Sequence, residues 1–510
     1  MPPTPSAMLS IALGLLLAPQ GPLSPPPLGP QALREAVVEH RLKNGWTFLI
    51  LPREGPPIVS FETLVEVGLA DEPQGMGGLV HMFEHMAFKG SDRIGSLDWA
   101  TEEAALAQVD RLHGELQRAR ADNEQANLAA LEADWSEAVS SAGALVRREE
   151  FSRLIERAGG AGSLNARTSA DNCRFVVSLP TNQVELWCWL ESERFLRPVL
   201  REFYLERDAV LEERNMRVDS NSTGILLEEL AASAFRVHPY GRPVIGSRSD
   251  IQRYDRESAM AFFEAKWSPS RCTTAIVGEV DPKTLIPLLE RYFSRVPARP
   301  GERPSPTPEP EQRGERSTLI EFPAQPLLAI GWRVPKASHQ DAPAIEVAIR
   351  LLGAARSSRL ERRLIRDDPL CARVFVENGW PGDQHSNLAY VLAVPLEGAA
   401  LEDIEAAILE EVQGLSENGP QADELEGVVR VARVEHLRSM RHNSAVAEGL
   451  LSAQSSLGDW RAYFDRITRL EDVTSADVQR VLRERFIALH QTTVVLAAVE
   501  ESIENEEEDG

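Results

Sequence analysis

Cysteine, basic residues and long apolar runs are all scarce in this 510-residue chain, and each scarcity argues against a class of protein. The cysteines form no Cys-x-x-Cys pair, which argues against a zinc knuckle or a redox motif. There are four of them, and their pattern does not fix their redox state: Cys173, Cys188, Cys272 and Cys371. With 54 Lys and Arg against 78 Asp and Glu, the formal net charge is -24, which argues against nucleic-acid binding. Such a charge suits basic or neutral peptides as ligands.

An apolar run from Ala7 to Ala18 is too short to cross a bilayer as a helix, so no transmembrane span is expected. A proline-rich stretch follows it up to Pro30. The first basic residue is Arg34, so the positive start of a typical signal peptide is missing. No cysteine follows the run, which argues against a lipid anchor there. We interpret residues 1–30 as a signal-like leader and expect an exported, periplasmic-type protein, with a cytoplasmic protein as the alternative.

The length is too great for one hydrophobic core and indicates two or more domains. Five prolines and many charges between Arg299 and Arg316 are typical of an extended linker. We therefore expect a first domain at residues 31–296, the linker at 297–316, a second domain at 317–500 and an acidic tail at 501–510.

Local patterns predict a mixed α+β chain. Residues 46–51, 58–67 and 173–179 alternate or are rich in β-branched residues, which predicts strands. Residues 97–148 are charged, rich in Ala and Leu and almost free of Gly and Pro, which predicts a long helical hairpin inserted in the first domain. Residues 271–277 and 491–496 are similar and each follows a helix, which indicates a diverged duplication.

The segment His81-Met82-Phe83-Glu84-His85 carries the strongest chemical signal of the chain. On a helix, His81 and His85 lie one turn apart and can bind one ion, while Glu84 shares their face. Zinc enzymes need a few protein ligands, an open position and a nearby general base. The order His-x-x-Glu-His is the inverted form of a common zinc-protease motif. By itself the pentapeptide leaves two paired surface or core histidines as an equal alternative.

A third zinc ligand is expected in the acidic helix that contains residues 206–213. Glu206, Val210 and Glu213 share one helical face, so Glu213 could bind the ion while Glu206 orients a ligand or the water. Composition alone does not choose between Glu212 and Glu213, and a solvated acidic helix is the commoner fate of such a run.

The motifs together resemble the pitrilysin/insulinase superfamily of zinc peptidases, and by size its mitochondrial processing peptidase subunits and their bacterial relatives. The family pattern continues from His-x-x-Glu-His to Glu-Arg-x-x-x-x-x-Glu, which matches Glu206 to Glu213. Further matches include Gly159-Gly160 with Asn165-Ala166-Arg167-Thr168, His238-Pro239-Tyr240-Gly241 with Ile245-Gly246, residues 275–281, and Leu352-Gly353 with Ser358-Arg359-Leu360.

The resemblance implies a zinc endopeptidase that cleaves short or unfolded polypeptides. One Zn²⁺ per chain would be held by His81, His85 and Glu213, with Glu84 as the catalytic base and Glu206 in support. The peptide would add to a sheet edge at Asn165 and Ala166; a plain turn role for Asn165 is an equal alternative. The family fold also implies two homologous domains, each a mostly antiparallel sheet flanked by helices, forming half of a clamshell.

One departure from the family pattern concerns an Arg and a Tyr that active members use to hold substrate. Ile365 and Ala372 stand at those positions. We therefore expect a heterodimer with a zinc-less sister subunit that carries the Arg/Tyr pair, or else a homodimer. The alternative function is a non-catalytic structural or peptide-binding subunit of the same fold. Intact His81, Glu84, His85 and Glu213 favour the peptidase.

Overall fold

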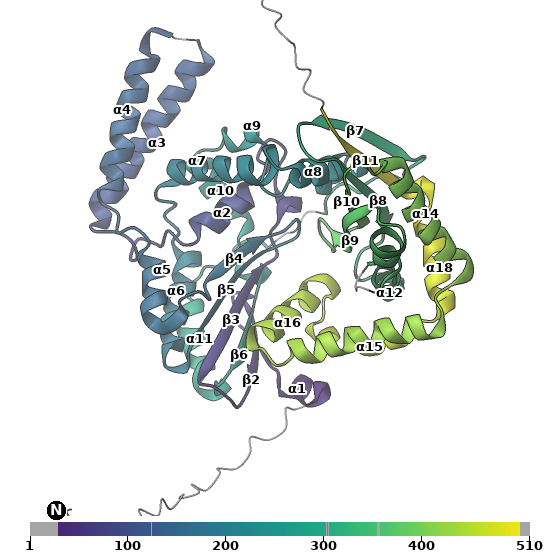
Figure 1. Cartoon of the computed structure of the whole chain (residues 1–510). Coiled ribbons are helices and arrows are strands. Elements are labelled where there is room, and N and C mark those ends of the chain that lie inside the picture. Colours follow the sequence, from purple (N-terminus) through teal and green to yellow (C-terminus); the bar gives the residue numbers. More distant parts are fainter. Residues whose placement is uncertain (1–28, 124, 302, 304, 354–356, 500–510) are drawn as a thin grey trace, which may run out of the picture.

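The computed structural model describes residues 29–499 except 124, 302, 304 and 354–356, and it shows helices packed around two sheets (Figure 1). The apolar run 7–18 and the acidic tail 501–510 lie outside the described residues. In the part of the chain that is described, no helix is both long and apolar enough to cross a membrane.

The first sheet has six strands in the order β1-β2-β6-β3-β5-β4. Only β2 and β6 run parallel; the other neighbours are antiparallel. The strands are β1 (Val38–Arg41), β2 (Thr47–Pro52), β3 (Ile58–Val65), β4 (Asn165–Thr168), β5 (Cys173–Pro180) and β6 (Cys272–Gly278). The strands predicted at 46–51, 58–67 and 173–179 are confirmed within two residues at each end.

The second sheet repeats this arrangement with five strands in the order β7-β11-β8-β10-β9. Here β7 and β11 form the single parallel pair, as β2 and β6 do in the first sheet. The strands are β7 (Arg316–Phe322), β8 (Leu327–Val334), β9 (Cys371–Trp380), β10 (Asn387–Pro395) and β11 (Gln491–Ala498). Taken in chain order, β7 to β11 occupy the places of β2 to β6, which confirms the predicted duplication.

Helices cover both faces of each sheet. The first half of the chain contributes α1 (Pro30–Ala36), α2 (Leu79–Met86), α3 (Trp99–Ala121), α4 (Gln125–Gly143), α5 (Glu150–Ile155), α6 (Val184–Leu196), α7 (Phe203–Arg214), α8 (Ser222–Ala234), α9 (Arg248–Ile251), α10 (Arg256–Lys266) and α11 (Pro282–Phe293). The second half contributes α12 (Ala342–Gly353), α13 (Arg359–Glu361), α14 (Leu401–Asn418), α15 (Ala422–Ser439), α16 (Asn443–Leu457), α17 (Arg466–Glu471) and α18 (Ser475–Arg485).

Side-chain alternation along the strands creates two cores for each sheet. On β2, Phe48 and Ile50 pack with helices α6 and α11, whereas Leu49 and Leu51 face the opposite side. Successive side chains of a strand point to opposite faces, so a strand buried on both faces has apolar residues at every position. The four cysteines are buried in these cores as free thiols and form no disulfide.

The two halves exchange one helix each, which the sequence did not indicate. Helix α16 from the second half covers β3 and β6 of the first sheet, where Leu450 packs with Leu49 and Val277. Helix α8 from the first half covers β7, β8 and β11 of the second sheet, where Leu230 packs with Val494. Neither sheet is therefore covered by its own half of the chain alone.

The predicted helical insertion is present as the α3–α4 hairpin, which projects from the first domain (Figure 1). A fully buried ion pair fixes its base: Arg201 Nε lies 2.7 Å from Glu102 Oε1 on α3. The same guanidinium donates to the carbonyl oxygens of Ile94 at 2.7 Å and Ser91 at 2.8 Å. The hairpin is thus joined to the loop that follows α2 and to the segment that precedes α7.

Candidate metal centre

The start of helix α2 is held by a buried carboxylate. Glu72 accepts hydrogen bonds from the backbone N–H groups of Gly78 at 2.9 Å and Val80 at 2.7 Å, and so satisfies donors that a helix start leaves free. Burial raises the pKa of Glu72 to about 8. Gly78 has a φ of 87°, and a Cβ there would collide with the Ile245 carbonyl. These contacts fix where the helix begins and therefore where its side chains point.

Helices α2 and α7 bring the three expected ligands together. His81 is buried and His85 is half-buried on α2, and their ring centroids lie 4.9 Å apart. Glu213 reaches them from α7, with its Oε2 atom 3.7 Å from His81 Nε2 and 3.1 Å from His85 Nε2. One ligand atom from each of the three residues lies within 4.8 Å of the others. The neighbouring Glu212 is exposed, so the geometry selects Glu213.

Glu206 occupies the place expected of a supporting carboxylate. Its Oε2 atom lies 3.5 Å from His85 Nδ1, on the opposite side of the imidazole from Glu213. Lys89 forms ion pairs with Glu206 and with Glu202, the latter at 3.2 Å. A carboxylate on the far nitrogen fixes the ring orientation and tautomer of a metal-binding histidine.

Glu84 is held by a hydrogen bond that the sequence analysis did not include. Thr168, the last residue of β4, donates from Oγ1 to Glu84 Oε2 at 2.6 Å. Burial raises the pKa of Glu84, and the Thr168 hydrogen bond partly opposes this rise. The carboxylate is thus fixed through Oε2, which leaves Oε1 for a proton.

The electrostatics separate the two histidines. Burial and the neighbouring His85 lower the pKa of His81 to about 4, so His81 is neutral near pH 7. Burial also disfavours the charge on His85, but hydrogen bonds and charges from Glu206 and Glu213 outweigh it and raise the pKa to about 9. The hydrogen bond from His85 lowers the pKa of Glu213.

The residues fit a catalytic zinc ion. Two imidazole nitrogens and one carboxylate oxygen are the donor set of many catalytic zinc sites. His81 Nε2 lies 3.7 Å from Glu213 Oε2, and its Nδ1 is buried without a hydrogen-bond partner. Among the described residues, His81, His85 and Glu213 are the one group of His, Cys, Asp or Glu close enough to hold an ion.

The substrate-contact residues expected from the sequence lie on the outer strand of the first sheet. Strand β4 pairs with β5 on one side, and no strand of the described residues pairs with its other edge, which we call the open edge. Asn165 is exposed at the start of β4, and Ala166 follows it as a half-buried residue. Of the two positions where the family has Arg and Tyr, Ile365 packs on the second core and Ala372 is exposed on β9.

Three polar residues at the centre were missed: Thr168, Lys89 and Arg217. Arg217 pairs with Glu213 Oε1 at 2.9 Å from the turn that follows α7. Its spacing of four residues from Glu213 was a signal for this pair. Lys89 lies beyond the end of α2 at Met86, so helical spacing gave no signal for its pairing with Glu206. Thr168 had no local signal, because its contact with Glu84 spans 84 positions of sequence.

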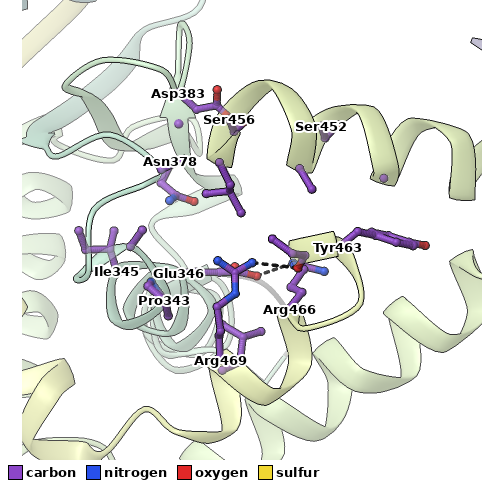
Figure 2. A pocket seen from close by; sticks show the side chains of 18 of the residues that line it. Pro343, Ile345, Glu346, Asn378, Asp383, Ser452, Ser456, Tyr463, Arg466 and Arg469 are labelled. Carbon is purple, nitrogen blue, oxygen red and sulfur yellow. Dashed lines mark hydrogen bonds and ion pairs between the residues drawn. The ribbon is translucent and has the colours of Figure 1, made fainter. Parts of the chain in front are cut away.

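The second domain has a cavity of about 810 Å³ beside α12, the helix that follows β8 as α2 follows β3 (Figure 2). Helix α12 contributes Ile345, Glu346, Ile349 and Arg350 to the cavity wall, and most of the rest is lined by β9, the β9–β10 loop, α15, α16 and α17. Its charges are paired with each other: Glu346 contacts Arg350 at 3.1 Å and also Arg466. This region therefore offers no counterpart of the three ligands.

Comparisons with known proteins identify the family of the two domains. Residues 138–248 match the family described as insulinase (peptidase family M16), and residues 253–431 match the peptidase M16 inactive domain. The first match begins after His81-x-x-Glu84-His85, within the inserted hairpin. The zinc protease PqqE of Helicobacter pylori is 25% identical over 89% of this chain and 91% of its own length.

Solved structures show the same fold. A protease from Helicobacter pylori superimposes with a TM-score of 0.76 at 23% identity, covering 90% of this chain and 99% of its own. The periplasmic protease PqqL from Escherichia coli gives a TM-score of 0.67 at 15% identity, covering 91% of this chain and 48% of its own. With its two matching domains and its two-sheet fold, the chain belongs to the insulinase (M16) family of peptidases.

Proposed function

We propose that the protein is a zinc-dependent endopeptidase that cleaves short or unfolded polypeptides. The observation that carries this proposal is the position of Glu84. It lies on the same helix as His81 and His85, it is held by Thr168 at 2.6 Å, and it is close enough to His85 and Glu213 for their charges to affect its pKa. A protein that only bound a structural ion would not need a fixed carboxylate beside it.

Each side chain of the centre has a role in this reaction. A bound Zn²⁺ would supply Lewis acidity and lower the pKa of a water molecule. Glu84 accepts a proton from the attacking water at Oε1 and returns it to the leaving amine. Thr168 keeps Oε2 occupied, and Glu206 keeps His85 oriented with Nε2 toward Glu213.

The open edge of β4 supports backbone-led binding of the peptide. An extended peptide that adds to this edge gains main-chain hydrogen bonds, and its scissile bond passes the end of β4 where Thr168 contacts Glu84. Asn165 and Ala166 would contact the peptide. Such binding requires an unfolded or short substrate, because a folded protein does not present a free strand.

We further propose that the working enzyme includes a second chain. Ile365 and Ala372 replace the Arg and Tyr that family members use on the substrate, and a zinc-less sister subunit could supply that pair. A homodimer is the alternative, and it would lack the pair. We also propose an exported location, supported by the apolar run near the N-terminus and by the periplasmic location of the similar PqqL.

A non-catalytic subunit is the second candidate function. The match of residues 253–431 to a domain described as inactive, together with the missing Arg/Tyr pair, favours it. Such a protein would bind peptides or support an assembly without cleavage. The complete set of His81, Glu84, His85 and Glu213 favours the peptidase.

The test compares wild type with Glu84→Gln, and uses Glu212→Gln on the exposed side of α7 as the matched control. Each is purified alone and with any co-expressed sister subunit, assayed for zinc content, and incubated with unfolded casein. A peptidase cleaves casein as wild type and as Glu212→Gln, whereas Glu84→Gln retains zinc and loses activity by about 10²-fold to 10⁴-fold. Zinc-loaded wild type that leaves casein intact with and without the sister subunit would support the non-catalytic subunit.

A further inference from the structure

The turn between β4 and β5 is hydrogen-bonded to the second domain. Asp171 lies in this turn, three residues after Thr168, and is only 1% exposed. Its Oδ2 atom accepts hydrogen bonds from the backbone N–H groups of Asp383 at 2.8 Å and Gln384 at 3.1 Å. Both donors belong to the loop that joins β9 to β10 in the second sheet. A single carboxylate of the zinc domain thus receives two main-chain donors of the metal-less domain.

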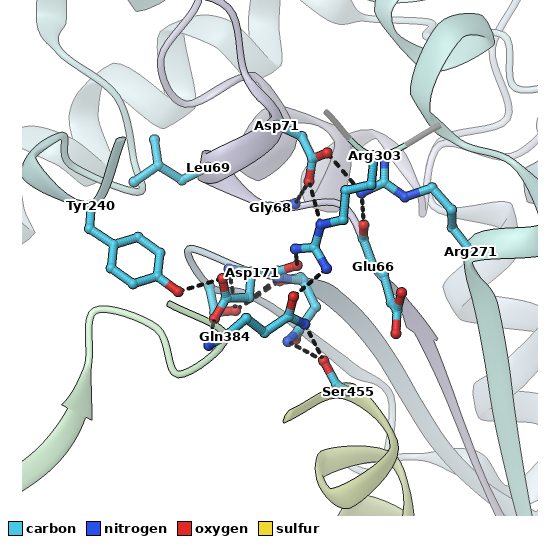
Figure 3. A network of polar contacts seen from close by, with 12 residues as sticks. Glu66, Gly68, Leu69, Asp71, Asp171, Tyr240, Arg271, Arg303, Gln384 and Ser455 are labelled. Carbon is cyan, nitrogen blue, oxygen red and sulfur yellow. Dashed lines mark hydrogen bonds and ion pairs between the residues drawn. The ribbon is translucent and has the colours of Figure 1, made fainter. Parts of the chain in front are cut away.

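The other carboxylate oxygen of Asp171 is bound within the first half of the chain. Tyr240 is fully buried and donates from its hydroxyl to Asp171 Oδ1 at 2.6 Å (Figure 3). This tyrosine belongs to the His238-Pro239-Tyr240-Gly241 motif, which the proposed chemistry does not use. Gly382 packs against both groups, and a Cβ there would lie 2.5 Å from Asp171 Oδ2 and 2.6 Å from the Tyr240 hydroxyl. Any side chain at position 382 would therefore displace the Asp171 carboxylate or the Tyr240 hydroxyl.

Neighbouring residues form further hydrogen bonds to the same turn. Arg303 donates to the Asp171 carbonyl oxygen at 3.3 Å and also contacts the side chain of Gln384. Ser455 on α16 accepts from Gln384 at 2.8 Å and from Asn172 at 3.4 Å. The linker, the β9–β10 loop and α16 all meet the same turn of the first sheet (Figure 3).

The turn connects directly to the candidate active site. Ser169 bonds to Asn172 across the turn, with its N–H donating to the Asn172 carbonyl at 2.8 Å. One residue earlier, Thr168 pairs with Cys173 on β5 and donates to Glu84. Strand β4 has only four residues and one paired edge, and the turn helps to hold it, together with its packing against α2 and the ion pairs of Arg167 with Glu62 and Glu448.

We propose that Asp171 is a positioning residue for the peptidase reaction. It ties the β4–β5 turn to the second domain and thereby holds both the peptide-accepting edge of β4 and the hydrogen bond from Thr168 to Glu84. The metal-less domain then has a defined part in catalysis by the other domain. This inference rests on the proposed function for its kinetic part, whereas the order of β4 is testable without any activity.

A double-mutant cycle tests the kinetic part. Thr168→Val removes the bond to Glu84 and is expected to lower kcat about 10-fold to 100-fold, the effect of losing a hydrogen bond to a charged group, whereas Thr168→Ser restores most of it. Asp171→Asn replaces one acceptor oxygen by an N–H₂ group, which must face either the Tyr240 hydroxyl or the backbone N–H groups of the β9–β10 loop. The change is expected to lower kcat about 10-fold and to raise KM. If Asp171 acts through Thr168, the double variant loses little more kcat than Thr168→Val alone. Losses that multiply overturn the proposal.

Amide hydrogen exchange tests the structural part in the zinc-loaded protein. Asp171→Asn is expected to speed exchange in residues 165–168, and zinc content stays at the wild-type level. The matched control is Arg34→Gln, which removes a 2.8 Å ion pair to Asp465 that also joins the two halves, but on the α1 side of the sheet, away from β4. Faster exchange in both variants, or in neither, overturns the proposal.

Two precautions keep the outcomes separate. If Asp171→Asn does not fold, Tyr240→Phe removes one of the three side-chain hydrogen bonds and is measured in its place, with the same expected direction. If wild type cleaves no peptide while zinc is bound, the proposed function fails, and the exchange experiment alone decides whether Asp171 orders β4.

Discussion

The two domains share one strand order but differ at the helix that follows the second strand of the repeat. In the first domain this helix is α2, and it presents two histidines and a glutamate beside the open strand β4. In the second domain it is α12, and it presents Ile345, Glu346, Ile349 and Arg350 to a cavity beside β9. The comparison shows that the fold depends on the burial pattern of the repeat, whereas the chemistry depends on a few side chains placed on it.

The same comparison shows that the domains are not independent units. Each sheet is covered in part by a helix from the other half of the chain, and Asp171 joins the turn beside the candidate active site to the loop before β10. The second domain is therefore part of the environment of the candidate metal centre. Substitutions can either remove the difference between the domains or show how strongly the domains are joined.

Replacing a ligand in α2 should have the largest effect. His81→Ala is expected to reduce the zinc content to nearly none and to lower cleavage at least about 10³-fold, because the charge that stabilises the transition state is lost. Glu346→Gln in α12 is the matched control and should keep its zinc. Metal analysis and a casein assay measure both. Zinc retained by His81→Ala would refute the assignment of the centre.

Truncating the exchanged helices should destabilise the whole molecule. Leu230 on α8 and Leu450 on α16 are fully buried, and a Leu→Ala change at each is expected to cost about 2–5 kcal/mol of unfolding free energy. Each variant should still unfold in one transition, because each helix belongs to both domains. Calorimetry that resolves two transitions, with only one shifted by each variant, would show independent domains instead.

Much of this arrangement could be predicted from the sequence, because its signals are local. Alternation along residues 58–67 predicted β3, and the absence of Gly and Pro over most of 97–148 predicted the hairpin. The spacing of His81, Glu84 and His85 placed them on one helix face. The helix exchange and the contact of Thr168 with Glu84 were not predictable, because they depend on packing between segments far apart in sequence.

Zinc affinity should depend on pH through His85. In the metal-free protein at pH 7, His85 holds a proton because its pKa is about 9, while His81 is neutral with a pKa of about 4. Zinc must displace the proton from His85, so affinity should rise about tenfold per pH unit up to roughly pH 9. Competition with a chelator at several pH values measures this. Glu206→Gln removes a charge that favours protonated His85 and so lowers its pKa. In this variant the zinc affinity should therefore stop rising at a lower pH than in wild type.

The same shifts affect the stability of the metal-free protein with opposite signs. The raised pKa of His85 adds stability that is complete below the unfolded value of about 6.5 and is lost as pH rises through about 9. The lowered pKa of His81 adds stability that is present above about 6.5 and is lost as pH falls toward about 4. Urea unfolding with a chelator present should follow this pattern, and saturating zinc should remove the loss above pH 7.

Changes at the two outer strands should have the smallest effect. Asn165→Ala on β4 is expected to raise KM about 3-fold to 10-fold, the effect of one lost hydrogen bond, with kcat nearly unchanged. Asn378→Ala on β9 is the counterpart in the second domain and should leave KM within about 2-fold of wild type. Steady-state cleavage of one unfolded peptide measures both. An equal rise for the two variants would mean that both outer edges take part in binding.

The helix exchange also has a consequence for synthesis. The apolar face of the first sheet is complete at Gly278, but the helix that covers it ends only at Leu457. At translation rates of 5–20 residues per second, the ribosome needs about 9–36 s to make the intervening segment. During that interval the nascent first domain exposes Leu49, Leu51 and Val277 to water. A chaperone that binds apolar segments would therefore meet this chain late in its synthesis, and a stalled or truncated product would be prone to aggregate.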